Sequence, residues 1–372
     1  MWHVSDLRRL VVLDGDRLSI RLAAQNLVGA DTTWLAGGAR KQARALLGQG
    51  RRDVVWELED GFDADVLGML HGVIEAGGRL IVLKGPWTPA WKGTAVWPHA
   101  EGGRRMEERL ERPLPEPVRI DADPLADQRA VVERLVRHWE VGPGIAVLTA
   151  DRGRGKSAAL GLALKGRGGR VTSPTRAAAA EVLRFAPDAT WVDAETVCDA
   201  ELLVVDEAAM FPIPVLEALI QRNPRARLVF ATTVHGYEGT GRGFAIRFLP
   251  RLREQGALEL TLTHPIRWRA GDPLERWVYD VLALDAAADG HLAGPLRTRR
   301  VDPDELASDE SLLRQVFGLL VEAHYRTTPA DLQRLLDGPN LRLFVFFFGA
   351  YSLFSGFGYL IVDPLLASPD SP

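Results

Sequence analysis

The chain has 372 residues, and its 45 Lys and Arg against 49 Asp and Glu give a net charge of −4. Hydrophobic residues make up 47% and charged residues 25%, so the composition excludes a wholly disordered, a collagen-like or a disulfide-stapled chain. The acidic balance argues against coating nucleic acid by bulk positive charge, although a local basic groove stays compatible with it. At about 150 residues per domain, the length predicts two to three domains.

Rare residue types narrow the chemistry further. A single cysteine, Cys198, allows no intrachain disulfide and no multi-cysteine zinc site, which favours a reducing compartment. The first residues, MWHVSDLRRLVVLDGD, have no long apolar core behind basic residues, so we expect no signal peptide and a cytoplasmic protein. Chemistry that needs a lysine has few candidates, because the sequence contains only Lys41, Lys84, Lys92, Lys156 and Lys165.

The N-terminal part alternates strand-like and helix-like runs. Short apolar runs separated by amphipathic helices are typical of βαβ units with a parallel sheet. We therefore predict an α/β domain over about 1–110. Its predicted strands cover 8–16, 53–60 and 79–85, and its predicted helices, which end at glycines, cover 39–50 and 63–78.

Residues 86–118 break this pattern and are predicted to form a connector or surface loop, because they are rich in proline. They also hold tryptophans and neighbouring arginines. Such a mixture could stack on RNA bases. Packing of the tryptophans onto the domain is the favoured alternative, because no periodic site is visible among Trp87, Trp91, Trp97, Arg104 and Arg105.

A second α/β run begins near residue 120, and we assign it to a domain over 118–286. No internal repeat is evident. The predicted helices cover 126–140, with Asp127 near its start, 156–166, 176–186 and 212–223. The predicted strands, with their following turns, cover 144–150, 169–175, 201–210 and 227–233.

The strongest motif is GIAVLTADRGRGKSAALGLALKG at 144–166, a buried strand, a glycine-rich turn and a helix. Small residues let backbone N–H groups approach phosphate oxygens, and the helix N-terminus adds partial positive charge. Lys156 would supply a charge for the β/γ-phosphates and the Ser157 hydroxyl a ligand for Mg²⁺. One position departs from the phosphate-loop pattern, since Ala150 stands where a glycine is expected. The alternative is an ordinary glycine turn.

A pair of acids follows an apolar run in LLVVDEAA. The run places Asp206 and Glu207 at the carboxyl end of a central strand, where an open α/β sheet presents its ligand chemistry. Asp206 would hold Mg²⁺, directly or through water, and Glu207 would polarise the attacking water. A pair of helix-capping acids is the alternative.

Three weaker features complete the candidate site. In LVFATTVHGYEGTGRGF (228–244) a strand ends at Thr232 and Thr233, where threonine can sense a γ-phosphate. Gln128 could read an adenine edge through its amide, and Arg267 could act as an arginine finger. The glycine-rich loop of the 228–244 segment would relay nucleotide state, touch RNA or be a flexible surface loop, and its polar residues are His235, Tyr237, Glu238, Thr240 and Arg242.

Five segments occur in a characteristic order: PLADQ, TADRGRGKSA, LLVVDEAAMFPIPVLE, ATTVHGYEGTGRGF and THPIRWRAGDPLERW. Together they resemble the ATPase module of the bacterial tRNA(Met) cytidine acetyltransferase (TmcA) family, which is related to the RNA cytidine acetyltransferases of eukaryotes and archaea. HGYEGTGRGF is the most specific piece, because ordinary helicases do not resemble it there. The resemblance covers about residues 1–342.

The resemblance implies an N-terminal α/β domain, a RecA/RecD-like P-loop ATPase domain and a GNAT-like acetyltransferase domain. ATP with Mg²⁺ would drive acetylation of the wobble cytidine of elongator tRNA(Met), with acetyl-CoA as donor, tRNA as partner and no DNA. The catalytic residues would be Lys156, Asp206, Glu207 and Arg267, and Mg²⁺ would be held through ATP by Ser157 and Asp206. The nucleotide would contact Gln128, Ala150, Asp151, Arg152, Gly153, Arg154, Gly155, Lys156, Ser157, Ala158, Ala159 and Arg267.

The C-terminal part departs from the family. Residues 311–345 look like the entry to the acetyltransferase domain, so we assign 287–345 to a truncated start of it. No acetyl-CoA turn is visible, and 346–372 form an atypical Phe-rich tail. We therefore expect a chain that retains the ATPase module and lacks acetyl transfer. The alternatives are a nucleic-acid-dependent ATPase such as a helicase, and an ATP-gated RNA-binding scaffold.

The uncharged stretch 343–362 has three interpretations. It has the length of a membrane span, but no basic cluster flanks it, so a membrane association is not favoured. It would otherwise be a buried strand pair interrupted by Gly356 and Gly358, or a non-native extension from a disrupted gene, which the abrupt change in composition favours. We interpret His291 and His324 as structural.

Overall fold

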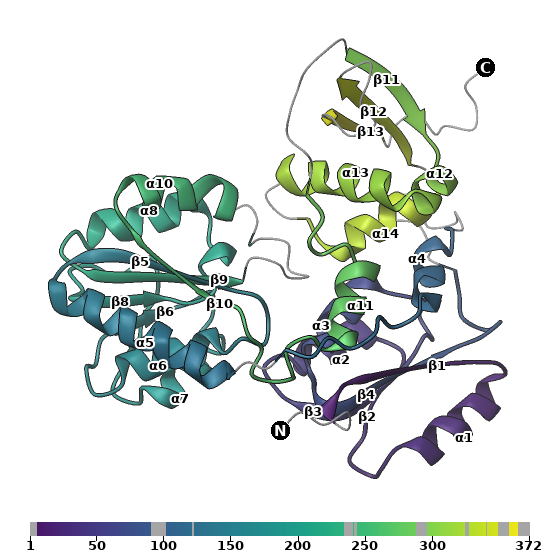
Figure 1. Cartoon of the computed structure of the whole chain (residues 1–372), viewed down its shortest axis with the longest axis horizontal. Helices are drawn as coiled ribbons and strands as arrows, with labels where there is room; N and C mark the ends of the chain where they lie inside the picture. The colour runs from purple at the N-terminus through teal and green to yellow at the C-terminus, as the bar shows by residue number, and fades with distance from the viewer. Residues whose placement is uncertain are drawn as a thin grey trace. The chain divides into compact units, whose positions relative to one another are not determined.

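The computed structural model describes residues 6–90, 102–120, 123–233, 241, 244–287, 296–323, 327–339, 341–348 and 357–363 (Figure 1). The chain forms two compact units. Unit 1 combines Met1–Arg119 with Gly271–Pro372, and unit 2 is Ile120–Ala270. This grouping differs from the predicted domain division, because the chain after Gly271 packs with the N-terminal part. Residues 271–286 are thus part of unit 1 in the structure.

The first half of unit 1 is a parallel sheet with helices. The sheet has four strands in the order β1-β4-β3-β2, and all three neighbouring pairs are parallel. The predicted βαβ architecture is therefore confirmed. The elements are β1 (Arg9–Asp14), α1 (Arg17–Leu27), β2 (Thr33–Leu35), α2 (Ala39–Ala45), β3 (Arg51–Glu57), α3 (Ala64–His71), β4 (Ile74–Lys84), α4 (Arg105–Glu108) and the 3₁₀ turn η2 (Arg109–Glu111).

Two local predictions for this sheet need correction. The helix predicted over 63–78 ends at His71, and strand β4 already begins at Ile74. Gly77 (φ +73°) and Gly78 lie where the β3–β4 register shifts, so this glycine pair makes a strand irregularity and not a helix stop. Helix α1 was not predicted, because it exposes apolar residues and buries only Ile20 and Ala24, which obscures the helical pattern.

The connector after β4 packs onto unit 1, in agreement with the favoured interpretation. The indole Nε1 of Trp87 donates to the Gly15 carbonyl over 3.2 Å, and the Arg17 guanidinium lies 5.3 Å from the ring centroid. The Arg105 backbone N–H donates to Asp337 Oδ1 over 2.8 Å. Trp91 and Trp97 lie outside the described residues.

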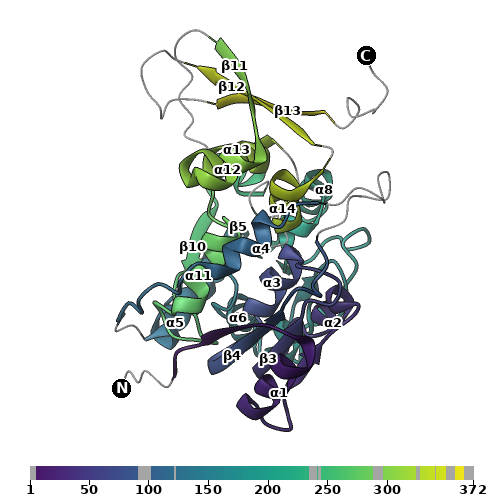
Figure 2. The ribbon, with the colours of Figure 1, turned by 90° about the vertical axis from the view of Figure 1, so that its right-hand side faces the viewer.

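The second half of unit 1 returns after unit 2. Its elements are α11 (Pro273–Val281), β11 (Leu296–Val301), α12 (Pro303–Ser308), α13 (Glu310–Ala323), α14 (Pro329–Asp337), β12 (Arg342–Phe348) and β13 (Phe357–Asp363). The three strands form an antiparallel sheet in the order β11-β12-β13, which lies beside α12 and α13 in Figure 2. The uncharged stretch 343–362 therefore contributes to two paired strands, as one of its three interpretations predicts, although Gly358 lies within β13 and does not interrupt the pair. Whether β13 is buried, as that interpretation also predicts, stays a prediction. No helix in the described part of the chain combines the length and apolar character that a membrane span requires.

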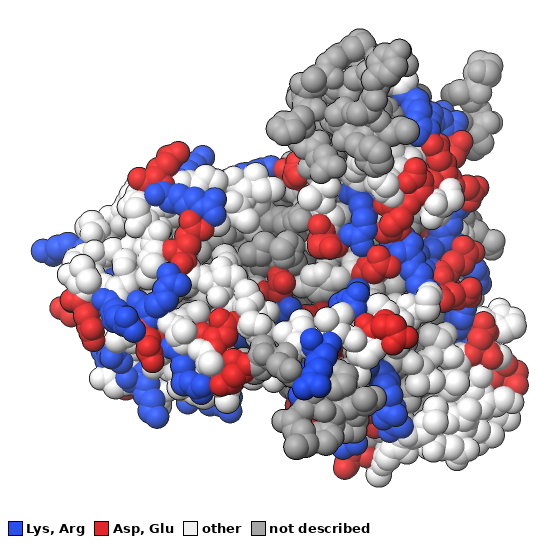
Figure 3. Space-filling model, viewed as in Figure 1, with Lys and Arg blue, Asp and Glu red and all other residues white. Residues whose placement is uncertain are grey.

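Ion pairs join the two halves of unit 1. Arg109 and Arg112 from the connector both contact Glu310 of α13, at 2.9 and 2.6 Å. Arg112 also contacts Asp280 of α11 at 2.8 Å. Many of the arginines thus have carboxylate partners, and basic and acidic side chains are intermixed on the face seen in Figure 3.

The most buried ion pair of unit 1 joins residues far apart in sequence. The Arg8 guanidinium donates to Asp272 Oδ1 through Nε (3.0 Å) and Nη2 (2.9 Å), and the Arg8 backbone N–H donates to Asp272 Oδ2 over 3.1 Å. Both side chains are fully buried. Asp272 also caps α11 by accepting from the Glu275 N–H. The chain before β1 is thereby attached to the start of α11.

Unit 2 is a three-layer α/β structure. Its six strands are parallel in the order β10-β5-β9-β8-β6-β7, so β9 lies between β5 and β8. Helices α5, α6 and α7 cover one face and α8 and α10 the other (Figure 1), with a hydrophobic core on each side. The elements are α5 (Pro124–Val141), β5 (Gly144–Ala150), α6 (Lys156–Leu164), β6 (Arg170–Thr172), α7 (Ala180–Phe185), β7 (Thr190–Trp191), β8 (Leu202–Val205), the 3₁₀ turn η3 (Ala208–Met210), α8 (Ile213–Arg222), β9 (Arg227–Thr233), the π-helical turn η4 (Phe244–Phe248), α10 (Leu249–Glu254) and β10 (Leu258–Leu262).

Arg8→Met leaves the Asp272 carboxylate buried without its cation. We expect unit 1 to lose about 3–5 kcal/mol, because breaking a buried pair from one side leaves an uncompensated charge. Native-state hydrogen exchange at the amides of β4 measures this loss within unit 1. Arg300→Met is the control, because Arg300 pairs with Asp302 at the surface and its loss should cost less than about 1 kcal/mol. An equally small effect of Arg8→Met would contradict the assignment.

Candidate functional site

The glycine-rich turn joins β5 to α6, as the motif predicts. Strand β5 ends at Ala150, which pairs with Thr233 of β9 and Leu262 of β10. Ala150 is thus an ordinary strand residue without a positive φ, and the departure from the glycine pattern requires no backbone adjustment. The positive φ values of the turn belong to Gly153 (+80°) and Gly155 (+76°).

Both of these glycines also need their missing side chains. A Cβ on Gly153 would lie 2.4 Å from the Trp268 ring, and a Cβ on Gly155 would lie 2.3 Å from Ile266 Cδ1. A side chain at either position would thus be strained in backbone conformation and would collide with the segment after β10. The two glycines therefore allow the segment after β10 to pack closely against the turn that precedes α6.

Four side chains meet at this turn, two from the start of α6 and two from the end of β8. The Lys156 ammonium lies 2.8 Å from Asp206 Oδ1 and 3.0 Å from Glu207 Oε1. The Ser157 hydroxyl donates to Asp206 Oδ2 over 2.8 Å. Asp206 is fully buried and Lys156 is 6% exposed, whereas Glu207 is 28% exposed. The predicted Lys156, Ser157, Asp206 and Glu207 therefore form one cluster.

The cluster keeps its lysine charged. Burial lowers the pKa of Lys156, but the charges of Asp206 and then Glu207, with their hydrogen bonds, outweigh burial and raise the pKa above its ordinary value. A charged ammonium at the start of α6 can exchange a carboxylate partner for a phosphate oxygen.

The same cluster offers hard oxygen donors for Mg²⁺ in Ser157 and Asp206. Within the described ranges no three His, Cys, Asp or Glu side chains gather to hold a metal by themselves. The donor set therefore fits an ion that completes its coordination with phosphate and water oxygens, as Mg²⁺ commonly does.

Glu207 has an unusual backbone conformation. Its φ is +51° in the left-handed region, and its N–H donates to Asp206 Oδ1 over 3.0 Å. Such a conformation costs a non-glycine residue of the order of 1 kcal/mol, and residues of this kind gather at functional sites. Glu207 thus stands between the end of β8 and the 3₁₀ turn η3, which begins at Ala208.

The neighbouring strand β9 ends beside the cluster. The Thr232 hydroxyl, which is buried, accepts from the Ala209 N–H over 3.3 Å and so holds the turn after the two acids. Thr233 is aligned with Ala150 at the end of β5. A role for these threonines in sensing a γ-phosphate stays a prediction. The predicted loop residues His235, Tyr237, Glu238, Thr240 and Arg242 lie outside the described residues, as do His291 and His324.

Gln128 and Arg267 are also brought to the glycine-rich turn. The Gln128 amide, which is buried, donates to the Gly155 carbonyl over 3.0 Å. The Ile266 N–H donates to the Gly153 carbonyl over 2.8 Å, and the backbone nitrogen of Arg267 lies 3.5 Å from the same oxygen. Sequence reasoning missed the roles of Asp127, Ile266 and Trp268, although all three lie within one residue of predicted positions.

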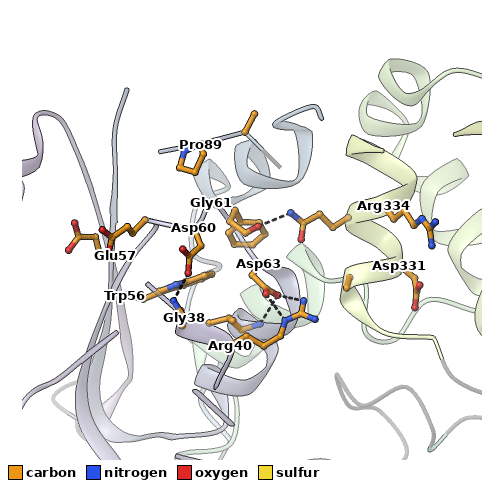
Figure 4. A pocket seen from close by; sticks show the side chains of 17 residues that line it. Gly38, Arg40, Trp56, Glu57, Asp60, Gly61, Asp63, Pro89, Asp331 and Arg334 are labelled. Atoms are coloured by element: carbon orange, nitrogen blue, oxygen red, sulfur yellow. Dashed lines mark hydrogen bonds and ion pairs between the residues drawn. The ribbon is translucent and has the colours of Figure 1, made fainter. Parts of the chain in front are cut away.

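Unit 1 holds a cavity of about 700 Å³ with an acidic wall, formed by β3, α2, α3 and α14 (Figure 4). Its carboxylates form hydrogen bonds and ion pairs within unit 1. Asp60 accepts from the Gly38 N–H over 2.6 Å, and Asp63 caps α3 while pairing with Arg40 at 2.7 Å. Buried Glu57 pairs with two arginines of α1. Capping and pairing thus account for these acids without a bound cation.

Comparison with known families agrees with both halves of the chain. Residues 147–193 and 187–285 match the family model described as RNA cytidine acetyltransferase NAT10/TcmA, helicase domain. Residues 2–117 match the model described as tRNA(Met) cytidine acetyltransferase TmcA, N-terminal.

Similar curated proteins carry the same description, tRNA(Met) cytidine acetyltransferase TmcA. The protein of Nitrosococcus halophilus is 38% identical over 91% of this chain and 57% of its own length. Those of Citrobacter koseri and Haloferax volcanii are each 34% identical, over 93% and 90% of this chain and 57% and 58% of their own. The chain therefore spans somewhat more than half the length of these relatives.

Lys156→Met should destabilise unit 2 in the absence of any ligand. The substitution leaves the Asp206 carboxylate buried with only two donors, the Ser157 hydroxyl and the Glu207 backbone N–H. We therefore expect the free energy of unfolding of unit 2 to fall by about 3 kcal/mol. Hydrogen exchange at the amides of β5 and β8 measures it. Lys165→Met, an exposed lysine just after the same helix, is the matched control and should change stability by less than about 1 kcal/mol. Equal effects of the two variants would argue against the cluster.

Proposed function

The chain belongs to the tRNA(Met) cytidine acetyltransferase (TmcA) family, and we propose that residues 1–372 carry out ATP hydrolysis for that family's reaction. The observation that carries this proposal is the cluster in which Lys156 and Ser157 meet Asp206 and Glu207 beside the glycine-rich turn. A charged lysine, a helix N-terminus and two acids at the end of a strand in the same sheet are the parts that phosphoryl transfer requires.

Each residue of the cluster has a distinct task in this mechanism. Backbone N–H groups of the turn and the start of α6 bind the phosphates, and Lys156 leaves the carboxylates to neutralise the β/γ-phosphate oxygens. Ser157 and Asp206 would hold Mg²⁺, which would supply positive charge to offset the negative charge that develops on the phosphoryl group. Glu207, the more exposed acid, orients and polarises the attacking water. Arg267 stabilises charge on the transferred phosphoryl group.

The remaining nucleotide contacts follow from the turn. We assign them to the loop residues Ala150–Ala159 and to Gln128, whose buried amide already lies at the Gly155 carbonyl and would turn toward the adenine edge. The strand order, with β9 between the lysine-bearing and the acid-bearing strands, supports a RecA/RecD-like P-loop ATPase domain.

The complete reaction in the family would couple this step to acetyl transfer. We propose elongator tRNA(Met) as partner, not DNA, and acetyl-CoA as donor, in the cytoplasm, because the relatives are described as tRNA(Met) cytidine acetyltransferases. We also propose that 311–345 begin a GNAT-like domain and that residues 1–372 alone do not transfer acetyl groups. The absence of a glycine-rich acetyl-CoA turn from the sequence supports this.

Lys156→Ala and Glu207→Gln should each lower ATP turnover about 100-fold or more, because one removes the phosphate charge and the other the water-activating carboxylate. Phosphate release with and without EDTA measures the turnover and its dependence on Mg²⁺. Lys165→Ala should hydrolyse ATP as the wild type does. Undiminished hydrolysis by Lys156→Ala would overturn the site assignment.

The polypeptide 1–372, mixed with ATP, acetyl-CoA and elongator tRNA(Met), should produce no acetylcytidine. Mass spectrometry of digested tRNA checks this, with a full-length relative such as the Citrobacter koseri protein as positive control. Acetylcytidine above the level seen without protein would show that the acetyl-transfer site lies within these residues.

A further inference from the structure

The segment after β10 lies across the glycine-rich turn. Its residues 263–268 contact the turn at three places. The Arg154 guanidinium donates through Nε to the Thr263 carbonyl over 3.2 Å, and the Ile266 N–H donates to the Gly153 carbonyl over 2.8 Å. Buried Trp268 fills the space beside Gly153. The backbone of Arg267 is therefore held between two residues that contact the turn.

One carboxylate oxygen holds the beginning of this segment. Asp127 Oδ2 accepts from the Thr263 N–H at 3.0 Å, the Thr263 hydroxyl at 3.3 Å and the His264 N–H at 3.3 Å. The His264 Nδ1 lies 3.4 Å from the same oxygen. Four polar contacts thus converge on one atom, and they join residues 136 positions apart in the sequence.

Asp127 is linked to the turn by its neighbour in the chain. Asp127 lies in the first turn of α5 directly before Gln128, whose amide donates to the Gly155 carbonyl. The start of α5 therefore contacts the glycine-rich turn through one residue and the Arg267 segment through the next. The glycine-rich turn and the Arg267 segment are thus connected through two adjacent residues of α5.

The Asp127 carboxylate remains ionised at neutral pH. Burial raises the pKa of Asp127, but the hydrogen bonds from Thr263 and His264 together lower it more, to below its ordinary value. Hydrogen bonds to an ionised acceptor are about twice as strong as neutral ones. The contact is strong enough to fix the segment, and it does not serve as the helix cap, because Asp123 accepts from the Leu125 N–H in that role.

We infer that Asp127 is a positioning residue for catalysis, which sets Arg267 against the glycine-rich turn by clamping Thr263 and His264. The inference rests on the proposed ATP hydrolysis and deepens it. In this arrangement Arg267 reaches the transferred phosphoryl group only while the segment stays clamped, so loss of Asp127 slows turnover more than it weakens ATP binding. Lys156, Asp206 and Glu207 are untouched by the clamp.

Steady-state ATP hydrolysis by three variants tests the inference. Asp127→Ala should lower kcat about 10- to 100-fold and change the KM for ATP by less than about threefold. Asp127→Asn should recover most of kcat, because its amide oxygen can replace the one oxygen that accepts from the Thr263 and His264 backbone N–H groups. Asp123→Ala is the matched control, since it removes a carboxylate from the same helix start outside the clamp, and its kcat should stay near the wild-type value.

Two further measurements separate positioning from a general structural role. If Asp127 acts through Arg267, the double variant Asp127→Ala/Arg267→Ala should be no slower than Arg267→Ala alone. Hydrogen exchange at the amides of Thr263, His264 and Ile266 should rise in Asp127→Ala and not in Asp123→Ala. Multiplicative losses in the double variant, or unchanged exchange, would overturn the inference.

The outcomes also distinguish the inference from the proposed function. A wild-type protein that hydrolyses no ATP would contradict the proposed function itself. If the wild type is active and Lys156→Ala is inactive, but Asp127→Ala has the wild-type kcat, the proposed function stands and the positioning role of Asp127 is wrong.

Discussion

A buried ammonium held between two carboxylates organises unit 2. Burying a charged group costs several kcal/mol per ion unless an oppositely charged group is close. The buried Lys156 ammonium has two such partners, the carboxylates of Asp206 at 2.8 Å and Glu207 at 3.0 Å. Those acids follow β8, whereas the lysine follows β5, and β9 lies between the two strands. Parallel strands bring their carboxyl ends to one edge, and in this order the cluster forms beside the end of β9. The strand order, the turn before α6 and the left-handed residue Glu207 together bring Lys156 into contact with the two carboxylates.

Unit 1 also contains a buried ion pair, formed by Arg8 and Asp272. Arg8 and Asp272 are fully buried, and Asp272 directly follows the point at which the chain returns from unit 2. The Val118 N–H, where the chain leaves unit 1, donates to the Gly271 carbonyl over 3.2 Å. Unit 2 is therefore an insertion in the sequence of unit 1, and unit 1 is completed by residues on both sides of it.

The part of this arrangement that follows local rules could be predicted from the sequence. Strands β5 and β9 match their predicted ranges residue for residue, because buried apolar runs bounded by turn residues leave little choice. The meeting of Lys156 with Asp206 follows from parallel-strand geometry. Helix α1 could not be predicted, since it exposes Leu18 and Leu22, and neither could the contact of Asp127 with Thr263, because pairing across 136 residues leaves no local pattern. The completion of unit 1 by Asp272 is hidden for the same reason.

At the glycine-rich turn, the backbone conformation and the neighbours of a position decide whether it needs a glycine. Ala150 replaces an expected glycine without consequence, because the position is extended and paired on both sides with β9 and β10. Alanine at Gly153 would meet a left-handed φ and the Trp268 ring together, although the two positions lie three residues apart. The requirement for glycine thus has a local cause, the left-handed φ, and a second cause in a segment more than 100 residues downstream. The glycine-rich turn and the segment that holds Arg267 are therefore packed together as one structural unit.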